Sequence, residues 1–116
     1  MGKNKENVIK CGIIGFGYMG MIRRHVLERH NNVHLTVICD PDKNKLLHEK
    51  NIEVFRDPMK IINSDVDAVF VCTPNHLIPD LTIKCLGRGK HVFVEKPPGR
   101  TLNDIVQMQA AEEQNP

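Results

Sequence analysis

The sequence predicts an α/β fold in which helices cover one parallel sheet on both faces. Five short apolar runs rich in Val and Ile alternate with segments whose apolar residues recur at helical spacing. Short joints separate them, which is typical of right-handed strand–helix–strand units. The composition suits one ordinary globular domain, because the 116 residues are 41% hydrophobic and 26% charged, with a net charge of +2.

The predicted strands are the apolar runs themselves. They are about four to eight residues long and apolar at successive positions, as expected of strands buried on both faces. In chain order they are residues 8–14, 33–39, 52–55, 66–72 and 91–94.

Helices are predicted between the strands from apolar spacing and from end signals. Asp57-Pro58 is typical of a helix start, and Thr101 to Asp104 has the form of a capping box. The predicted helices are residues 18–30, 58–62, 79–86 and the segment after Thr101, and residues 42–50 are expected to form a solvated helical face. No sixth strand follows the last helix, so we expect residues 1–116 to be one domain of a longer protein.

Composition also excludes several classes of function. The apolar runs are far shorter than the ~20 residues of a membrane span, and the polar N-terminus has no signal-peptide core. No long basic run indicates nucleic-acid binding. The histidines show no metal-binding spacing, so no metal is expected. Four cysteines without a CxxC pair favour reduced, buried thiols and a cytoplasmic protein: Cys11, Cys39, Cys72 and Cys85.

A glycine motif links the first predicted strand to the first predicted helix. Gly15, Gly17 and Gly20 form G-x-G-x-x-G, and in this context the motif indicates dinucleotide binding. Gly15 would permit the tight turn, Gly17 would let the backbone approach a pyrophosphate, and Gly20 would let the helix pack closely. The residues between them (Phe16, Tyr18 and Met19) belong to the same candidate loop. A plain strand-to-helix turn is the alternative.

Asp40 ends the second predicted strand, 20 residues after Gly20. An acidic residue there accepts hydrogen bonds from the adenosine ribose, and its charge repels a 2′-phosphate. Asp40 and the adjoining Pro41 therefore predict NAD rather than NADP, although Lys43 nearby would soften that preference. Alternatively, Asp40 only caps the next helix.

Two polar segments follow the fourth and fifth predicted strands. They are Thr73-Pro74-Asn75-His76 and Glu95-Lys96-Pro97-Pro98. Open parallel sheets bind ligands at the carboxyl ends of their strands, so both segments are candidates for the site, although either could be only a turn. A lysine there can approach a nicotinamide or a hydroxyl group.

Together with the run from Gly89 to Pro97 (GKHVFVEKP), these segments resemble the Gfo/Idh/MocA oxidoreductases, the relatives of glucose–fructose oxidoreductase and inositol dehydrogenase. The resemblance covers nearly the whole chain. It implies a Rossmann-like, doubly wound parallel sheet of order 3-2-1-4-5, here without its sixth strand. It also implies an NAD(P)-dependent dehydrogenase of sugars, cyclitols or sugar nucleotides, homo-oligomeric at full length.

The resemblance also implies roles for single residues. The backbone from Gly15 to Gly20 would hold the pyrophosphate and Asp40 the adenosine ribose. Residues 73–76 would line the groove towards the nicotinamide, and Glu95 would bind the nicotinamide-side ribose. Lys96 would be catalytic, between cofactor and substrate, and its bond to Pro97 would be cis or an ordinary trans turn.

The chain departs from the family pattern in two places. Ile78 stands where members often carry a second histidine. The second domain, which in the family supplies the catalytic Asp and His, lies outside these 116 residues, so the chain alone is expected to bind the cofactor and be inactive. A non-enzymatic dinucleotide sensor is the alternative. Methyl transfer from S-adenosylmethionine is less favoured, because no acidic residue precedes the glycines.

Overall fold

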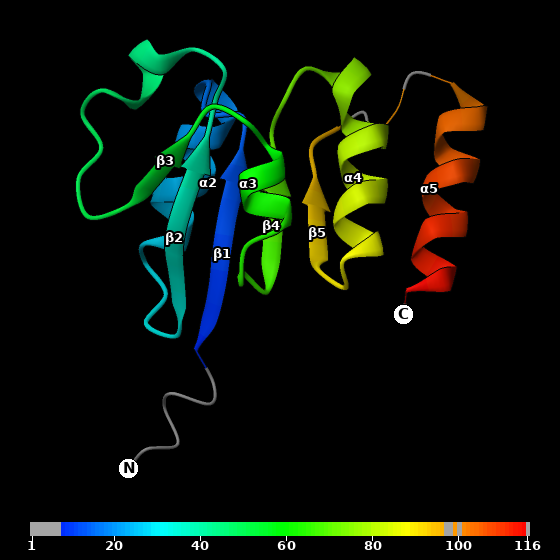
Figure 1. Ribbon diagram of the computed structural model, residues 1–116, viewed down its shortest axis with the longest axis horizontal. Coiled ribbons are helices and arrows are strands. Elements are labelled where there is room, and N and C mark those ends of the chain that lie inside the picture. The colour runs from blue at the N-terminus through cyan, green and yellow to red at the C-terminus, as the bar shows by residue number, and fades with distance from the viewer. Residues whose placement is uncertain (1–7, 97–98, 100, 116) are drawn as a thin grey trace.

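The computed structural model describes residues 8–96, 99 and 101–115. Within these residues a five-stranded parallel sheet has the order β3-β2-β1-β4-β5 (Figure 1), as predicted. Its strands are β1 (Ile9–Ile14), β2 (Val33–Cys39), β3 (Glu53–Phe55), β4 (Ala68–Val71) and β5 (His91–Val94). The fourth strand is shorter than expected at both ends, and this leaves Cys72 in the loop beyond it.

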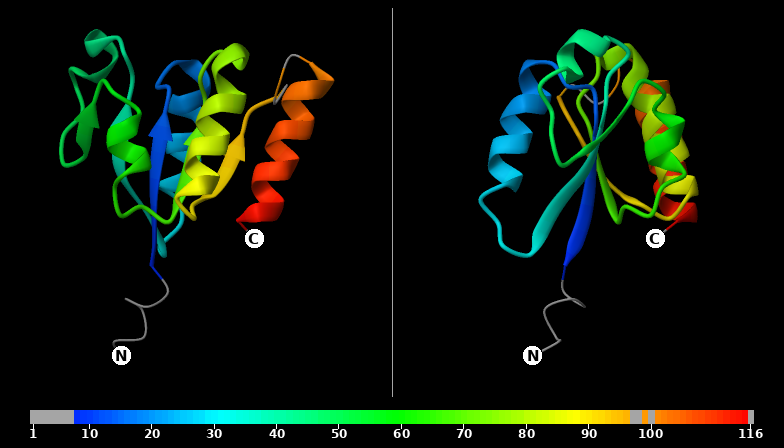
Figure 2. Two further views of the ribbon diagram at one scale, coloured as in Figure 1. Left: turned by 45° about the vertical axis from the view of Figure 1, so that its right-hand side comes forward. Right: turned by 60° about the vertical axis from the view of Figure 1, so that its left-hand side comes forward.

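Helices cover both faces of the sheet. They are α2 (Tyr18–Leu27), α3 (Met59–Ile62), α4 (Ile78–Gly87) and α5 (Leu102–Gln114), with single 3-10 turns η1 (Lys43–Leu46) and η2 (Asn75–Leu77). Figure 2 shows α2 on one face and the other three helices on the opposite face. Among the described residues, no helix has the length and apolar character that crossing a membrane requires.

The central strand β1 is buried on both faces because its side chains enter two separate cores. Ile13 packs with Leu27 of α2 and Ile38 of β2 on one side. Ile14 packs on the other side, in the core that includes Ile61 of α3. Burial on both faces explains why β1 is a continuous apolar run, and it gives the glycine loop that follows a rigid base.

Local signals in the sequence account for the starts of α3 and α5. The Asp57 carboxylate accepts a hydrogen bond from the Met59 N–H at 3.0 Å and so caps α3. Thr101 and Asp104 form the predicted capping box, with each side chain accepting from the other residue's N–H. Helix α2 ends at Leu27, three residues before the predicted end, because the amides of Arg29 and His30 bond to carbonyls only three residues back.

The prediction of a helical face over residues 42–50 was wrong. Only η1 forms there, and it is a single 3-10 turn. The Asp42 carboxylate accepts from the Asn44 N–H at 3.0 Å, and Asn51 has a positive φ of 65°. Both features favour turns over a continuous helix, because short polar side chains compete for backbone groups.

Candidate functional site

Four strands end level with one another, and this places four chain segments side by side. Ile14 is in register with Cys39 of β2 and with Val71 of β4, and Val71 is in register with Val94 of β5. The next residues along these strands are Gly15, Asp40, Cys72 and Glu95. The structure therefore brings the predicted segments together at the carboxyl edge of the sheet.

The three glycines of the loop meet different surroundings. Gly15 has a φ of +93°, and a Cβ there would lie 2.7 Å from the Cys72 carbonyl oxygen. A Cβ on Gly20 would lie 2.3 Å from the Gly15 carbonyl oxygen. Glycine at these two positions is therefore required by the fold itself.

Gly17 has open space above it. A Cβ there would meet only the Lys45 Nζ atom, at 3.8 Å, within the part of the chain that the structure describes. Gly17 is also the N-cap of α2, with no side-chain cap and no acidic residue in the first helical turn. The first N–H groups of α2 are thus free to bind an anion, next to a lysine ammonium.

The other residues of this loop differ in exposure. Phe16 is 4% exposed, and its ring lies under the Arg24 guanidinium, 5.9 Å from the ring centroid. Met19 is half-buried, whereas Tyr18 is 79% exposed. Phe16 therefore anchors the loop to the core, and Tyr18 faces solvent beside the open helix end.

Asp40 is buried, with 5% of its surface exposed. Its Oδ2 atom accepts from the Phe16 N–H and its Oδ1 atom from the Asp42 N–H, both at 2.8 Å. The carboxylate thus joins the end of β2 to the glycine loop, while Asp42 caps η1. Pro41, exposed beside it, accepts a hydrogen bond from Arg56 Nε at 3.1 Å through its carbonyl oxygen.

Thr73 to His76 lie opposite the glycine loop. The Thr73 nitrogen would be 2.9 Å from a Cβ on Gly15, so the two segments are in close contact. Asn75 and His76 form the 3-10 turn η2, where a loop had been expected, and this turn leads directly into α4. Thr73 and Asn75 are half-buried, whereas Pro74 and His76 are exposed.

Glu95 lies at the end of β5, and its carboxylate is paired with Arg23 of α2. Arg23 Nε and Nη2 donate to the two Glu95 oxygens at 2.6 and 3.1 Å. The Cys72 thiol also faces this carboxylate, with 3.8 Å between Sγ and Oε2. Lys96 follows and is exposed, and Pro97 lies outside the described residues, as does its bond to Lys96.

The ion pair and burial both shift nearby pKa values. The hydrogen bond to Glu95 raises the pKa of Arg23. Burial, with a smaller contribution from the Glu95 charge, raises the pKa of the Cys72 thiol to about 12. Cys72 is therefore a protonated donor beside Glu95 at neutral pH, and it is not a reactive thiolate.

Two residues of this edge, Arg23 and Lys45, were not predicted from the sequence. Arg23 is 72 positions from Glu95, and only the fold, which packs α2 over β1 and β2, brings the Arg23 side chain to the end of β5. Lys45 was assigned to a solvated helical face, but η1 turns it towards Gly17. The sequence offered one hint that Lys45 belongs to the site, which is that it lies five residues after Asp40, the candidate ribose ligand.

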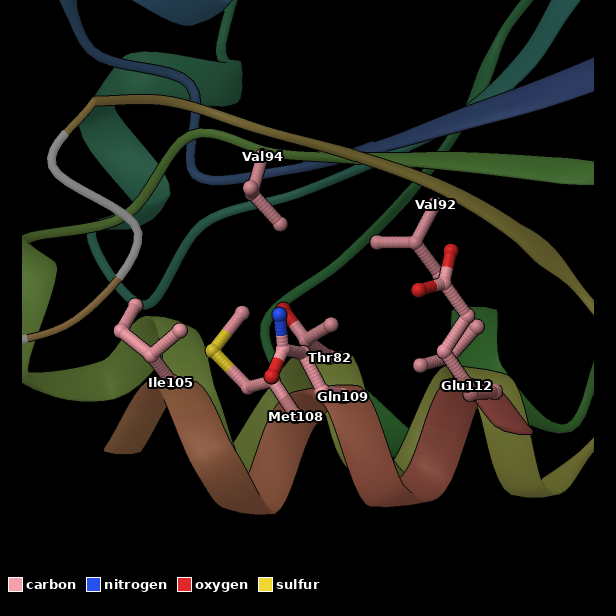
Figure 3. Close-up of a pocket in the computed structure, with 8 residues that line it drawn as sticks. Thr82, Val92, Val94, Ile105, Met108, Gln109 and Glu112 are labelled. Carbon is pink, nitrogen blue, oxygen red and sulfur yellow. The ribbon is translucent and has the colours of Figure 1, made fainter. Parts of the chain in front are cut away.

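A cavity elsewhere in the fold lies between β5, α4 and α5 (Figure 3). Its volume is about 230 Å³, and none of the predicted site residues lines it. Val92 and Val94 point into it from β5, opposite Ile105, Met108 and Gln109 of α5, and Thr82 lies beside Gln109 (Figure 3). Within the described ranges, no three His, Cys, Asp or Glu side chains lie close enough together to hold a metal ion.

Comparison with known proteins places this geometry in a family. The model of the Gfo/Idh/MocA family, an oxidoreductase family with an NAD-binding Rossmann fold, matches residues 9–116. A myo-inositol 2-dehydrogenase of Thermotoga maritima is 32% identical over 105 residues, which cover 86% of this chain and 31% of that protein. A scyllo-inositol 2-dehydrogenase (NADP(+)) of Bacillus subtilis is 30% identical over 113 residues, covering 89% of this chain and 30% of that protein.

Solved structures agree with the sequence relatives. The scyllo-inositol dehydrogenase from Lactobacillus casei, crystallised with bound NAD(H) and scyllo-inositol, has a TM-score of 0.86 at 30% identity. The match covers 93% of this chain and 34% of that one. The chain therefore spans about a third of the length of the relatives it matches.

Proposed function

Because the chain belongs to the Gfo/Idh/MocA oxidoreductase family, we propose that residues 1–116 are the cofactor-binding domain of a longer NAD-dependent dehydrogenase. The observation that carries this proposal is the open space above Gly17. No described atom requires a glycine there, because a Cβ would meet only the Lys45 ammonium at an ordinary contact distance of 3.8 Å, and the φ of −85° suits other residues. A ligand that approaches the backbone closely is a sufficient reason for that glycine.

The pyrophosphate would lie at the N-terminus of α2. The loop from Gly15 to Gly20 would supply N–H groups, and Lys45 would add a positive charge to balance the two phosphates. The adenosine ribose would lie against Asp40 and Pro41. The groove towards the nicotinamide would run along Thr73, Pro74, Asn75 and His76 to Glu95 and Lys96.

NAD is proposed over NADP because the Asp40 charge lies where a 2′-phosphate would have to bind. The family itself does not decide this choice. One relative at 30% identity is named for NADP(+), and one solved structure at the same identity holds NAD(H). Lys43, three residues after Asp40, is the group that would weaken the preference.

In the longer protein the reaction would be the oxidation of a hydroxyl group on a sugar, cyclitol or sugar nucleotide. The cofactor would take up the hydride from the carbinol carbon. Lys96 is exposed at the end of β5, where it would hold the substrate hydroxyl and take part in removing its proton. The second catalytic group and most of the substrate pocket would come from the rest of the protein, so the 116 residues alone would be inactive.

Two further expectations belong to the whole protein. Homo-oligomerisation is proposed at full length, through surfaces outside this domain. A cytoplasmic location is proposed because Cys11, Cys39 and Cys85 are buried free thiols, as expected in a reducing compartment.

Substitution at Gly17 tests the proposal. Gly17→Ala should weaken NADH binding by about tenfold or more, because its methyl group occupies the approach of the pyrophosphate. The thermal midpoint should fall by about 4–8 °C at most, because the methyl group clashes with no described atom and alanine in place of glycine at the N-cap of α2 costs about 1 kcal/mol. Titration calorimetry gives the affinity and calorimetric melting gives the midpoint.

Gly87→Ala is the matched control, because Gly87 also has open space around it but lies at the far end of α4. It should leave the NADH affinity unchanged. Unaltered binding by Gly17→Ala would contradict the placement of the pyrophosphate. A folded wild-type chain that binds neither NADH nor NADPH at millimolar concentration would overturn the proposed function, the sensor alternative included.

A further inference from the structure

Arg23 makes a more extensive set of contacts than an ordinary surface arginine. Its guanidinium donates two hydrogen bonds to Glu95 and lies over the Phe93 ring, 4.7 Å from the centroid. The Phe93 ring in turn packs against Phe70 of β4, with 5.2 Å between centroids. The Arg23 and Glu95 side chains are only 27% and 14% exposed. Arg23 of α2 thus contacts both Phe93 of β5 and Glu95, the residue that follows that strand.

The two strand residues share one face of the sheet. Side chains alternate along a strand, so Phe93 and Glu95 point towards α2, whereas Val92 and Val94 line the cavity on the other face (Figure 3). Arg23 therefore joins the end of β5 to α2 on one face of the sheet, while Val92 and Val94 pack against the core on the other face.

The sheet itself holds this end weakly. The amide of Glu95 bonds to the Val71 carbonyl oxygen at 3.4 Å, whereas the corresponding bonds of Gly15 and Cys72 are both 2.8 Å. Strand β5 is also an edge strand, paired only with β4 in the described sheet. A two-bond ion pair stacked on an aromatic ring is a stronger restraint than one long backbone bond.

We propose that Arg23 is a positioning residue that fixes Glu95, and with it Lys96, relative to the glycine loop at the start of α2. This inference rests on the proposed function. It assigns Glu95 the role of anchoring the end of β5 to α2, because that carboxylate accepts two hydrogen bonds from Arg23 and also faces the Cys72 thiol. The ADP half of the cofactor would bind the loop without Arg23, whereas the nicotinamide half would depend on it.

The test compares NADH with ADP as ligands of the same chain. Arg23→Met should weaken NADH binding by about tenfold and ADP binding by less than about twofold. Arg23→Lys should restore part of the loss, because an ammonium keeps the charge but cannot form the two-bond fork. Arg29→Met is the control, since Arg29 lies just beyond α2 and its side chain has no partner in the described residues.

Two further measurements separate positioning from general stability. In the cofactor-free protein, Arg23→Met should speed hydrogen exchange at the Glu95 amide and leave exchange at the Ile13 amide unchanged. The double variant Arg23→Met/Glu95→Gln should bind NADH no more weakly than Arg23→Met, because both changes remove one interaction.

The outcomes are distinct. Equal losses for NADH and ADP, or a lower thermal midpoint with both affinities unchanged, would overturn the inference. Additive losses in the double variant would return Glu95 to direct cofactor contact and would also overturn it. A wild-type chain that binds neither ligand would overturn the proposed function instead, and hydrogen exchange alone would then decide whether Arg23 holds the end of β5.

Discussion

Asp40 combines a structural role with its proposed binding role. Its two carboxylate oxygens accept from the amides of Phe16 and Asp42, so it orders the glycine loop before any ligand is present. Each oxygen keeps a further lone pair, which would accept from a ribose hydroxyl. Sequence spacing alone suggested either a ribose ligand or a helix cap. The structure assigns the cap of η1 to Asp42 and leaves the ribose role as a proposal.

Asp40→Ala should therefore have two effects. The ratio of NAD to NADP affinity should fall, because the charge that repels a 2′-phosphate is lost. The free energy of unfolding should fall by about 1–3 kcal/mol, because the buried Phe16 amide loses its acceptor. Asp42→Ala is the control. It should remove only the hydrogen bond that caps η1 and should leave the ratio of NAD to NADP affinity unchanged. Calorimetry with both dinucleotides and urea unfolding measure these effects, and an unchanged ratio would rule out the ribose assignment.

At the scale of elements, the sequence predicted helix ends best where the capping hydrogen bonds are made by residues close together in the chain. The capping box of Thr101 and Asp104 and the cap at Asp57 need only neighbouring residues, and both were predicted. Residues 42–50 depend on distant contacts. Arg24 of α2 bonds to Glu49, and the buried Leu46 packs in the core beneath α2, so tertiary contacts shape this segment. The spacing of charged residues within 42–50 could not predict these tertiary contacts.

Helix α4 contains one group that its surroundings do not satisfy. The Thr82 hydroxyl is buried beside the cavity under α5 and has no hydrogen-bond partner in the described structure. Thr82→Val keeps the shape and removes the polar atom, so it should raise the free energy of unfolding by about 1 kcal/mol. The matched control is Thr36→Val, which should give no gain because the Thr36 hydroxyl bonds to the Cys11 carbonyl oxygen. Lower stability of Thr82→Val in urea unfolding would show that the hydroxyl is satisfied.

At the scale of the whole molecule, buried thiols connect stability to pH. Burial raises the pKa of Cys39 and Cys72 to about 12 and that of Cys85 to about 11, against 9.0 for a free thiol. The unfolded chain therefore loses these protons first as the pH rises. Their contribution to stability is complete below pH 9 and falls as the pH approaches about 12.

Unfolding by urea at pH about 8 and about 10 should show this loss. The Cys72→Ala variant should lose less stability than the wild type over the same interval, because one of the four thiols whose pKa is raised by burial is gone. Equal losses in the two proteins would mean that Cys72 ionises in the folded state as it does in the unfolded chain.

The parallel sheet and the edge that carries the candidate segments follow from apolar runs, short joints and the rule for parallel strands, whereas the strand order was implied by the family resemblance. The pairing of Arg23 with Glu95 could not be predicted from the sequence. It depends on how α2 lies over the sheet, which brings together two residues 72 positions apart, and on the alternation that turns Glu95 and Phe93 to the same face. Spacing rules describe neighbours along a chain, whereas this contact is set by the packing of layers.

The unequal surroundings of the three loop glycines have a consequence for how such a domain evolves. Gly15 and Gly20 are required by backbone contacts, so selection for folding alone would preserve them. Gly17 meets no such constraint, so only selection for ligand binding would preserve it. In a descendant that had lost its nucleotide, the first and third glycines would persist while the middle one drifted to other residues. Retention of the middle glycine would therefore indicate that ligand binding is kept, whereas retention of the outer two would indicate only that the fold is kept.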